Sequence, residues 1–180
     1  ALVRGCENTV IPDSVTEIEH CAFTYCNSLK SVVIPDSVIK IGGGAFLECR
    51  SLKSIVIPDS VTSIGGSAFY ECTSIENITI SGSVTSISNN TFECCTSLRD
   101  IVIPKGVKSI GVCAFYNCTS LTTVVLPVGV AKIGKNAFID CPALSTISVP
   151  AGKADYYKKR LPQNLHQYIV EREPEKKAKK

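Results

Sequence analysis

Hydrophobic and polar positions repeat along this chain with a fixed period of 23 residues. A phenylalanine marks every period, and a cysteine follows each one three residues later. They are Phe23, Phe46, Phe69, Phe92, Phe115 and Phe138, with Cys26, Cys49, Cys72, Cys95, Cys118 and Cys141. A period of this length is typical of solenoids, in which each coil buries its apolar edges against neighbouring coils. The pattern therefore indicates that function lies on a surface rather than in a pocket.

One repeat can be read from residues 34 to 56, with the consensus I-P-x-S-V-x-x-I-G-x-x-A-F-x-x-C-x-S-L-x-x-I-x. Ile55 and Ile57 lie two residues apart, which puts both on one face of a short strand. Pro58 ends the pairing because it has no N–H to donate. The spacing predicts a parallel ladder near residues 29–34, 52–57, 75–80, 98–103, 121–126 and 144–149. We expect the A-F-x-x-C segments to form tight turns or one-turn helices, with the phenylalanine rings stacked at the coil spacing.

This repeat resembles the BspA-like, or Treponema-type, leucine-rich repeats over roughly residues 1 to 150. The segment Val149-Pro150-Ala151-Gly152, with the later Tyr156-Tyr157 and Leu161-Pro162, resembles the end of such proteins from gut Bacteroidales. The resemblance implies a leucine-rich-repeat solenoid: right-handed, with 23-residue coils and a parallel β ladder. It also implies a non-catalytic binding role, often bacterial surface adhesion to host or microbial proteins. It carries over no functional residues, because the family has no shared site motif.

Three regions follow from this interpretation: repeats in residues 1–150, a cap in 151–171 and a disordered basic tail in 172–180. In the cap, Tyr157, Leu161, Leu165 and Tyr168 recur at helical spacing, so we expect two short helical segments over the last coil. Pro162 is acceptable in the first turn of the second segment.

Composition and charge narrow the possible classes. Apolar residues make up 44% and aromatic residues only 7%, without Trp or Met, which predicts a core of Val, Ile, Leu and stacked Phe. Residues 1–150 carry 10 basic and 12 acidic side chains, whereas residues 151–180 carry 9 basic and 4 acidic ones. The excess lies mainly at the end of the chain and has no interleaved aromatic, so we expect no nucleic-acid partner.

The ten cysteines allow more than one interpretation. Equivalent cysteines on successive coils point the same way, which leaves their Cβ atoms about 4.8 Å apart, too far for an unstrained disulfide. We therefore expect buried free thiols that bond weakly to loop backbone groups. The alternative is a disulfide that involves the cysteines outside or beside the ladder, namely Cys21, Cys94, Cys95 and Cys113. A zinc site is disfavoured because no C-x-x-C occurs.

No pattern indicates an enzyme or a cofactor. The segment Gly129 to Asn136 reads G-x-x-x-x-G-K-N, but Asn136 replaces the Ser or Thr with which a phosphate-binding loop holds its metal. His20 and His166 cannot be placed beside a nucleophile, and Glu48 falls on an outer loop with Glu71 and Glu93.

The predicted binding surface is the outward side of the ladder. One position gives a row of Val, Val, Thr, Val, Val and Ser, beside Lys30, Lys53 and Arg99 and interrupted by Glu76. The predicted site residues are Lys30, Val33, Lys53, Val56, Glu76, Asn77, Thr79, Arg99, Asp100, Val102, Thr122 and Val125. A shallow apolar groove with charged flanks suits a protein partner, either a host matrix or a microbial surface protein. The alternative is that strand propensity alone explains the row.

The fourth repeat departs most from the consensus, with Ile75, Ser81, Ser88 and Thr91 at otherwise regular positions. Sequence drift and a locally altered turn that aims residues 76–79 at a ligand both remain open.

The N-terminus, the lengths of the apolar runs and the cysteine content bear on cellular location. No initiator Met or signal pattern is present, so we interpret the chain as an excised fragment or a processed product. No apolar run approaches the roughly 18 residues that a membrane span needs. The resemblance implies a monomeric module at the cell surface or secreted. The alternative is a cytoplasmic scaffold or adaptor, because chains rich in free cysteine suit reducing compartments.

Overall fold

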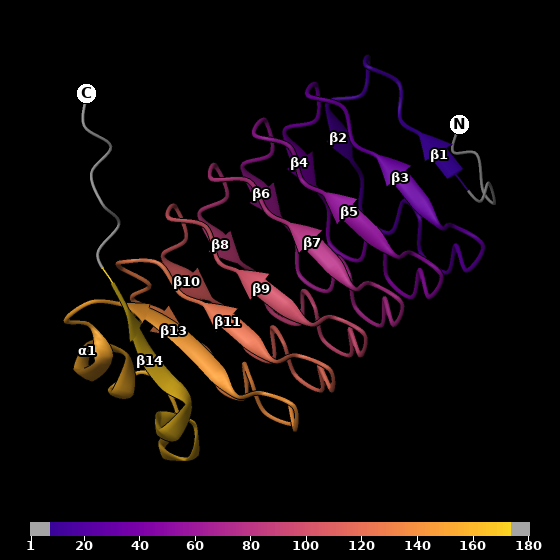
Figure 1. Ribbon diagram of the computed structural model, residues 1–180. Helices are drawn as coiled ribbons and strands as arrows, with labels where there is room; N and C mark the ends of the chain where they lie inside the picture. Colours follow the sequence, from indigo (N-terminus) through magenta and orange to yellow (C-terminus); the bar gives the residue numbers. More distant parts are fainter. Residues whose placement is uncertain (1–7, 174–180) are drawn as a thin grey trace.

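The computed structural model describes residues 8–173, which wind into a parallel β-solenoid (Figure 1). Successive coils place strands side by side along one face, which we call the front ladder. Its strands are β1 (Asn8–Val10), β3 (Ser31–Val33), β5 (Ser54–Val56), β7 (Asn77–Thr79), β9 (Asp100–Val102), β11 (Thr123–Val125) and β13 (Thr146–Pro150). Partners are 23 residues apart, so Thr9 pairs with Val32 and Val124 with Ile147. The predicted solenoid and ladder are confirmed, with strands shorter than predicted and one further strand before residue 29.

A second row of strands, the rear ladder, runs behind the first (Figure 1). It consists of β2 (Glu17–Ile18), β4 (Lys40–Ile41), β6 (Ser63–Ile64), β8 (Ser86–Ile87), β10 (Ser109–Ile110) and β12 (Lys132–Ile133). Each strand directs one isoleucine inward and one polar residue outward. This ladder was not predicted from the sequence, because two residues per coil are too few to show an alternating pattern.

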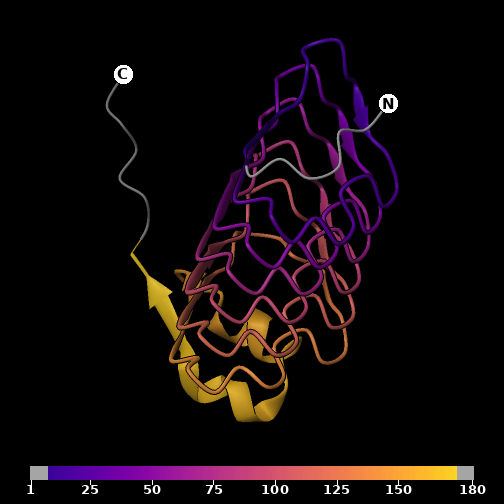
Figure 2. The same ribbon diagram turned by 90° about the vertical axis from the view of Figure 1, so that its right-hand side faces the viewer.

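The phenylalanines form the predicted stack through the core. Centroids of successive rings are 5.1 to 5.5 Å apart, and the planes differ by at most 19°. A view turned by 90° shows the coils nested along the solenoid, with the C-terminal cap at one end (Figure 2). Rings at this spacing fill the turn side of every coil, so each coil depends on the next for its packing.

The turns between the two ladders follow the same period. Each A-F-x-x-C segment is a tight turn and not a one-turn helix, so the first of the two predicted forms is confirmed. Two registers of the turn have positive φ. The residue directly before the segment is Cys21, Gly44, Ser67, Asn90, Cys113 or Asn136, and the residue before its cysteine is Tyr25, Glu48, Glu71, Cys94, Asn117 or Asp140. Because only glycine adopts this conformation without steric cost, the repeat fixes this geometry through its neighbours and not through residue type.

Glycine at one repeat position is explained by contact between coils. A Cβ on Gly111 would lie 2.5 Å from the backbone nitrogen of Asn89, and one on Gly65 would lie 2.4 Å from that of Gly43. The backbones of adjacent coils therefore approach too closely for a side chain.

The cap contains the two expected helical segments and one unexpected strand. The helices are α1 (Ala154–Lys158) and the 3₁₀ helix η1 (Gln163–Tyr168), which bury Tyr157 and Leu165, while the segment between them buries Leu161. The strand is β14 (Ile169–Arg172), which pairs in parallel with β13 and extends the front ladder. The disordered tail was predicted to begin at residue 172, but Arg172 is the last residue of β14. Residues 174–180 of the predicted tail lie outside the described residues.

The departures of the fourth coil are accommodated inside the repeat. The hydroxyl of Ser81 accepts a hydrogen bond from the N–H of Ser83, that of Ser88 donates to the Ile64 carbonyl, and that of Thr91 donates to the Ser88 carbonyl. β7 keeps the regular register with β5. The polar substitutions are satisfied locally, and the strand that they follow is not displaced.

Candidate functional site

The front ladder presents three parallel registers of outward side chains, and all twelve predicted site residues lie in them. The first register, before each strand, contains Lys30, Lys53, Glu76, Arg99, Thr122 and Ser145. The second contains Asn8, Ser31, Ser54, Asn77, Asp100, Thr123 and Thr146. The third contains Val10, Val33, Val56, Thr79, Val102, Val125, Ser148 and Val170.

The third register is the predicted β-branched row, and most of it is exposed. Val33 and Val102 are each 61% exposed and Val56 is 63% exposed. Val125, in contrast, is half-buried and therefore exposes less apolar surface than these three valines. Large aliphatic side chains held open to water in one line give an apolar strip, interrupted by Thr79 and Ser148, on an otherwise polar ladder.

The strip is longer than the sequence analysis found. Val10, at 75% exposure, precedes it on β1, and Val170, at 52%, continues it on β14, where it pairs with Ser148. Val10 could have been found, because Val10-Ile11-Pro12 repeats the end of the later strands. Val170 follows no repeat motif, so no sequence signal placed it in the row.

Backbone hydrogen bonds fix the first register. The N–H of Glu76 donates to the Lys53 carbonyl at 2.9 Å, and that of Thr122 to the Arg99 carbonyl at 2.7 Å. The residues thus stand about one strand spacing, roughly 4.8 Å, apart. The first register therefore borders the apolar strip with charges in a fixed order, namely Lys30, Lys53, Glu76 and Arg99.

The second register is polar and partly paired with itself. The Ser31 hydroxyl donates to the Asn8 side-chain oxygen at 2.6 Å. The Thr122 hydroxyl donates to the carboxylate of Asp100 at 2.9 Å, which joins the first register to the second. These bonds order the polar surface beside the strip, so a partner meets a largely preformed face.

The nine cysteines among residues 8–173 are free thiols, as predicted, but only Cys49, Cys72, Cys95 and Cys118 are buried; Cys21 is exposed and the other four are half-buried. The nine in the described residues form no disulfide, and Cys49, Cys72, Cys95, Cys118 and Cys141 each donate to the carbonyl of the phenylalanine one coil earlier, at 3.0 to 3.2 Å. Burial raises the pKa of Cys49 to about 12 and that of Cys141 to about 11. Such thiols stay protonated at neutral pH and are poor nucleophiles.

Of the other candidate residues, Glu48 and Glu71 are brought together, because the carboxylates of both pair with Nη2 of Arg50 at 2.7 Å. The two histidines lie in different parts of the fold. His20 is exposed on a loop, and a ring nitrogen of His166 bonds to the carbonyls of Lys158 and Leu161 in the cap. Within residues 8–173 no group of three His, Cys, Asp or Glu side chains could hold a metal ion. Over the same span no helix is long and apolar enough to cross a membrane.

Comparison with known structures shows the same architecture in other bacterial proteins. The Leucine Rich Repeat protein of T. pallidum is 34% identical, covers 91% of this chain and is itself covered to 81%, with a TM-score of 0.78. A leucine-rich repeat protein from Eubacterium ventriosum is 31% identical over 81% of this chain and 40% of its own, with a TM-score of 0.76. A leucine rich cell surface protein from Faecalibacterium prausnitzii, at 24% identity, covers 87% of this chain and 63% of its own, with a TM-score of 0.57, and shares the fold.

The family model agrees with the repeat found in the sequence. No curated protein matches the chain. The model of the BspA type leucine rich repeat region matches residues 4–107 and 85–167. Together with the two ladders, the phenylalanine stack and the cysteine at each turn, this match shows that the chain belongs to the BspA-type leucine rich repeat family.

Proposed function

We propose that this chain is a non-catalytic module that binds a protein partner through the front ladder, within a bacterial surface or secreted adhesin. The observation that carries the proposal is the row of exposed aliphatic side chains in the third register, with Val33, Val56 and Val102 more than half exposed. Their desolvation against an apolar surface would be favourable, by about 25 cal/mol per Å². The charged first register would fix the orientation of the partner.

The shape of the face indicates the class of partner. A flat strip with a polar border matches the anatomy of protein interfaces, in which an apolar centre is surrounded by polar groups. A small molecule would need an enclosed cavity, and the strip has none. The surface location is supported by the family and by a neighbour of the same fold that is described as a cell surface protein. Host matrix or microbial surface proteins are the partners to test.

The test compares a front variant with a matched control variant. The front variant carries Val56→Glu, Arg99→Glu and Val102→Glu, and the control carries Ile39→Glu, Lys40→Glu and Val128→Glu, which make the same change in charge at exposed positions off the front ladder. Binding to immobilised matrix and microbial surface proteins is measured by biolayer interferometry, with circular dichroism to verify folding. We expect the front variant to lose at least tenfold in affinity and the control less than twofold. Undiminished binding by the folded front variant would move the site off this face.

The nine free thiols favour a second possibility, an intracellular scaffold that uses the same face. Antibody labelling of intact and permeabilised cells of the source organism separates the two. Labelling of intact cells supports the adhesin, and labelling only after permeabilisation supports the scaffold.

A further inference from the structure

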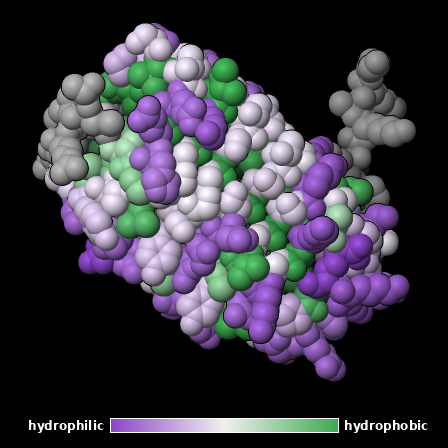
Figure 3. Space-filling view, turned by 180° about the vertical axis from the view of Figure 1, so that it is seen from behind, coloured by the Kyte–Doolittle hydropathy of each residue, from purple (hydrophilic) through white to green (hydrophobic). Residues whose placement is uncertain are grey.

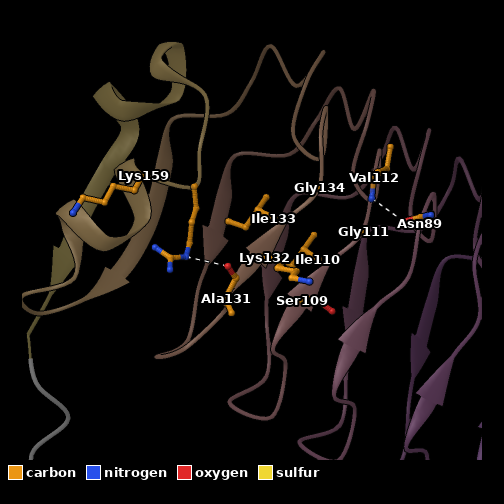
Figure 4. Close-up of a pocket in the computed structure, with 11 residues that line it drawn as sticks. Asn89, Ser109, Ile110, Gly111, Val112, Ala131, Lys132, Ile133, Gly134 and Lys159 are labelled. Carbon is orange, nitrogen blue, oxygen red and sulfur yellow. Dashed lines mark hydrogen bonds between the residues drawn. The ribbon is translucent and has the colours of Figure 1, made fainter.

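A shallow hollow of about 610 Å³ opens on the rear of the solenoid, where the last strands of the rear ladder meet the cap (Figure 4). Its floor is formed by β10, β12 and the glycines that follow them, so few side chains project into it. The lining residues are Asn89, Ser109, Ile110, Gly111, Val112, Ala131, Lys132, Ile133, Gly134, Lys159 and Arg160. None of them is acidic.

Arg160 is held in a fixed orientation at the edge of this hollow. Its guanidinium lies over the ring of Tyr156, 3.5 Å from the centroid. Its Nε donates to the Ala131 carbonyl at 3.1 Å, and Nη1 donates to the Tyr156 carbonyl at 2.6 Å. These contacts leave Nη2 as a donor for a ligand. A guanidinium fixed in this way loses little conformational freedom when it binds an anion.

Further cations surround Arg160. Lys132 lies on β12, and Lys159 forms the outer rim with its side chain directed away from the strands (Figure 4). Outside the lining, Lys108 directly precedes β10 and Lys135 follows Gly134, and both are exposed. None of these five cations forms an ion pair within residues 8–173. The space-filling view from behind shows hydrophilic side chains gathered toward the C-terminal end of this face (Figure 3). The last repeats and the cap thus assemble a basic surface here that the order of charges along the chain did not reveal.

The polar lining suits a ligand that carries both anions and hydroxyl groups. The side-chain oxygen of Asn89 accepts the N–H of Val112 at 2.8 Å, which leaves its amide group to donate (Figure 4). The Ser109 hydroxyl adds a second uncharged polar group. The lining has no aromatic ring, so it offers no stacking platform for nucleic-acid bases. It also has no deep apolar recess to anchor the side chain of an acidic peptide.

We propose that this hollow binds an anionic glycan, a sugar chain that carries sulfate or carboxylate groups. Arg160 and Lys132 would bind the anionic groups, Asn89 and Ser109 the sugar hydroxyls, and Lys108, Lys135 and Lys159 would add longer-range attraction. The site lies on the opposite side from the front ladder, so it is independent of the proposed protein-binding face.

The test measures binding of a heparin hexasaccharide by isothermal titration calorimetry at two salt concentrations. The full chain is used, both with its own sequence and with Lys176, Lys177, Lys179 and Lys180 changed to Gln, so that the basic tail does not mask the result. Hollow variants are Lys132→Gln with Lys159→Gln, and Arg160→Lys alone. The matched control is Lys53→Gln with Arg99→Gln, which removes the same charge from the front ladder.

In both backgrounds we expect the hollow variants to bind roughly tenfold more weakly and the control to change less than twofold. Binding should weaken as salt rises. Equal losses in hollow and control variants, absence of binding by the original chain, or binding that disappears with the tail lysines would each overturn the proposal. Oligothymidine or a polyglutamate peptide that binds as tightly, with the same dependence on Lys132 and Arg160, would assign the hollow to nucleic acid or to acidic protein instead.

Discussion

The thiol of Cys95 donates a hydrogen bond to the backbone carbonyl of Phe69 at 3.2 Å, 26 residues earlier in the chain. The bond links the turn of one coil to the turn of the coil before it. Since the same bond recurs between Cys49 and Phe23, the cysteine of the repeat is a connector between coils. Its size and its weak donor suit a buried place beside the phenylalanine stack, where a larger polar group would not fit.

Replacement of Cys95 tests this connection. Cys95→Ala removes the thiol donor, while the Phe69 carbonyl keeps its bond from the N–H of Cys72 at 3.2 Å, so the free energy of unfolding should fall by about 1 kcal/mol. Urea denaturation measures the change. Cys21→Ala, at an exposed thiol, is the control and should change stability by less than about 0.5 kcal/mol. Equal effects of both substitutions would mean that the buried thiol does not connect the coils.

The buried thiols also predict a loss of stability in alkali. Burial raises the pKa of Cys49 to about 12 and shifts the pKa values of Cys72, Cys95 and Cys118 upward. The unfolded chain releases these protons above the ordinary value of 9.0, whereas the folded chain retains them. Their contribution is therefore complete below about pH 9 and is lost progressively as the pH rises toward the folded pKa values.

Each such thiol should contribute a slope of about 1.4 kcal/mol per pH unit in that range. The measurement is the free energy of unfolding in urea from pH 8 to pH 10.5, for the original chain and for Cys95→Ala. The variant should show the shallower dependence. Identical slopes would exclude a raised pKa for this thiol, because all other titrating groups are shared.

The phenylalanine stack should be the most sensitive part of the core. Phe92 is completely buried, with ring centroids of Phe69 and Phe115 at 5.5 and 5.3 Å. Phe92→Ala leaves a cavity between coils that cannot close, and should cost about 3 to 5 kcal/mol by chemical denaturation. Tyr25→Ala, at a ring that is 62% exposed, should cost far less. A change below about 1 kcal/mol for Phe92→Ala would contradict this account of the core.

Close approach of coil backbones gives a matched pair of glycine substitutions. A Cβ at Gly111 meets backbone and side-chain atoms of Asn89 within 2.6 Å, while a Cβ at Gly82 meets nothing within 4 Å. We expect Gly111→Ala to lower the free energy of unfolding by about 2 kcal/mol or more, and Gly82→Ala to change it by less than about 0.5 kcal/mol. Similar thermal midpoints for the two variants would show that the coils can separate locally.

The cap should weaken in acid through Glu171. Its carboxylate accepts the N–H groups of Ala154 at 2.7 Å and Gly152 at 3.0 Å, and these bonds lower its pKa. A lowered pKa means that the contribution is present above the ordinary value of 4.5 and is lost as the pH falls through the folded value. The thermal midpoint should therefore fall more between pH 6 and pH 3 for the original chain than for Glu171→Gln. Parallel profiles would remove Glu171 as the cause.

Sequence reasoning located the parts of the fold that repeat. The spacing of Ile55, Ile57 and Pro58 was enough to place a front strand, and the 23-residue step of Phe92 and its equivalents was enough to predict the ring stack. Both features depend on interactions between equivalent positions in adjacent coils, so the repeat period alone predicts which residues are in contact. The same reasoning placed Tyr157 and Leu161 in the cap, because a solenoid must cover its last coil.

The features that were not predicted from the sequence depend on contacts between non-equivalent positions, which the repeat period does not reveal. β14 joins the ladder through Ile169 and Val170, which no repeat motif marks, and each rear strand is too short to show alternation. The hollow combines Lys132 with Arg160, which lies beyond the repeats and reaches Ala131 only because the cap folds back. Charge counted along the chain could not show this arrangement.

The constant register of the coils has an evolutionary consequence. Duplication or deletion of one complete 23-residue unit between β3 and β7 would shift the coils by one step along the axis and keep the register of strand pairing. The length of the apolar strip could change in this way without any change at the rear hollow, whose first lining residue, Asn89, lies after β7. Front and rear faces could therefore diversify separately within a lineage, one by gain or loss of units and the other by point substitution.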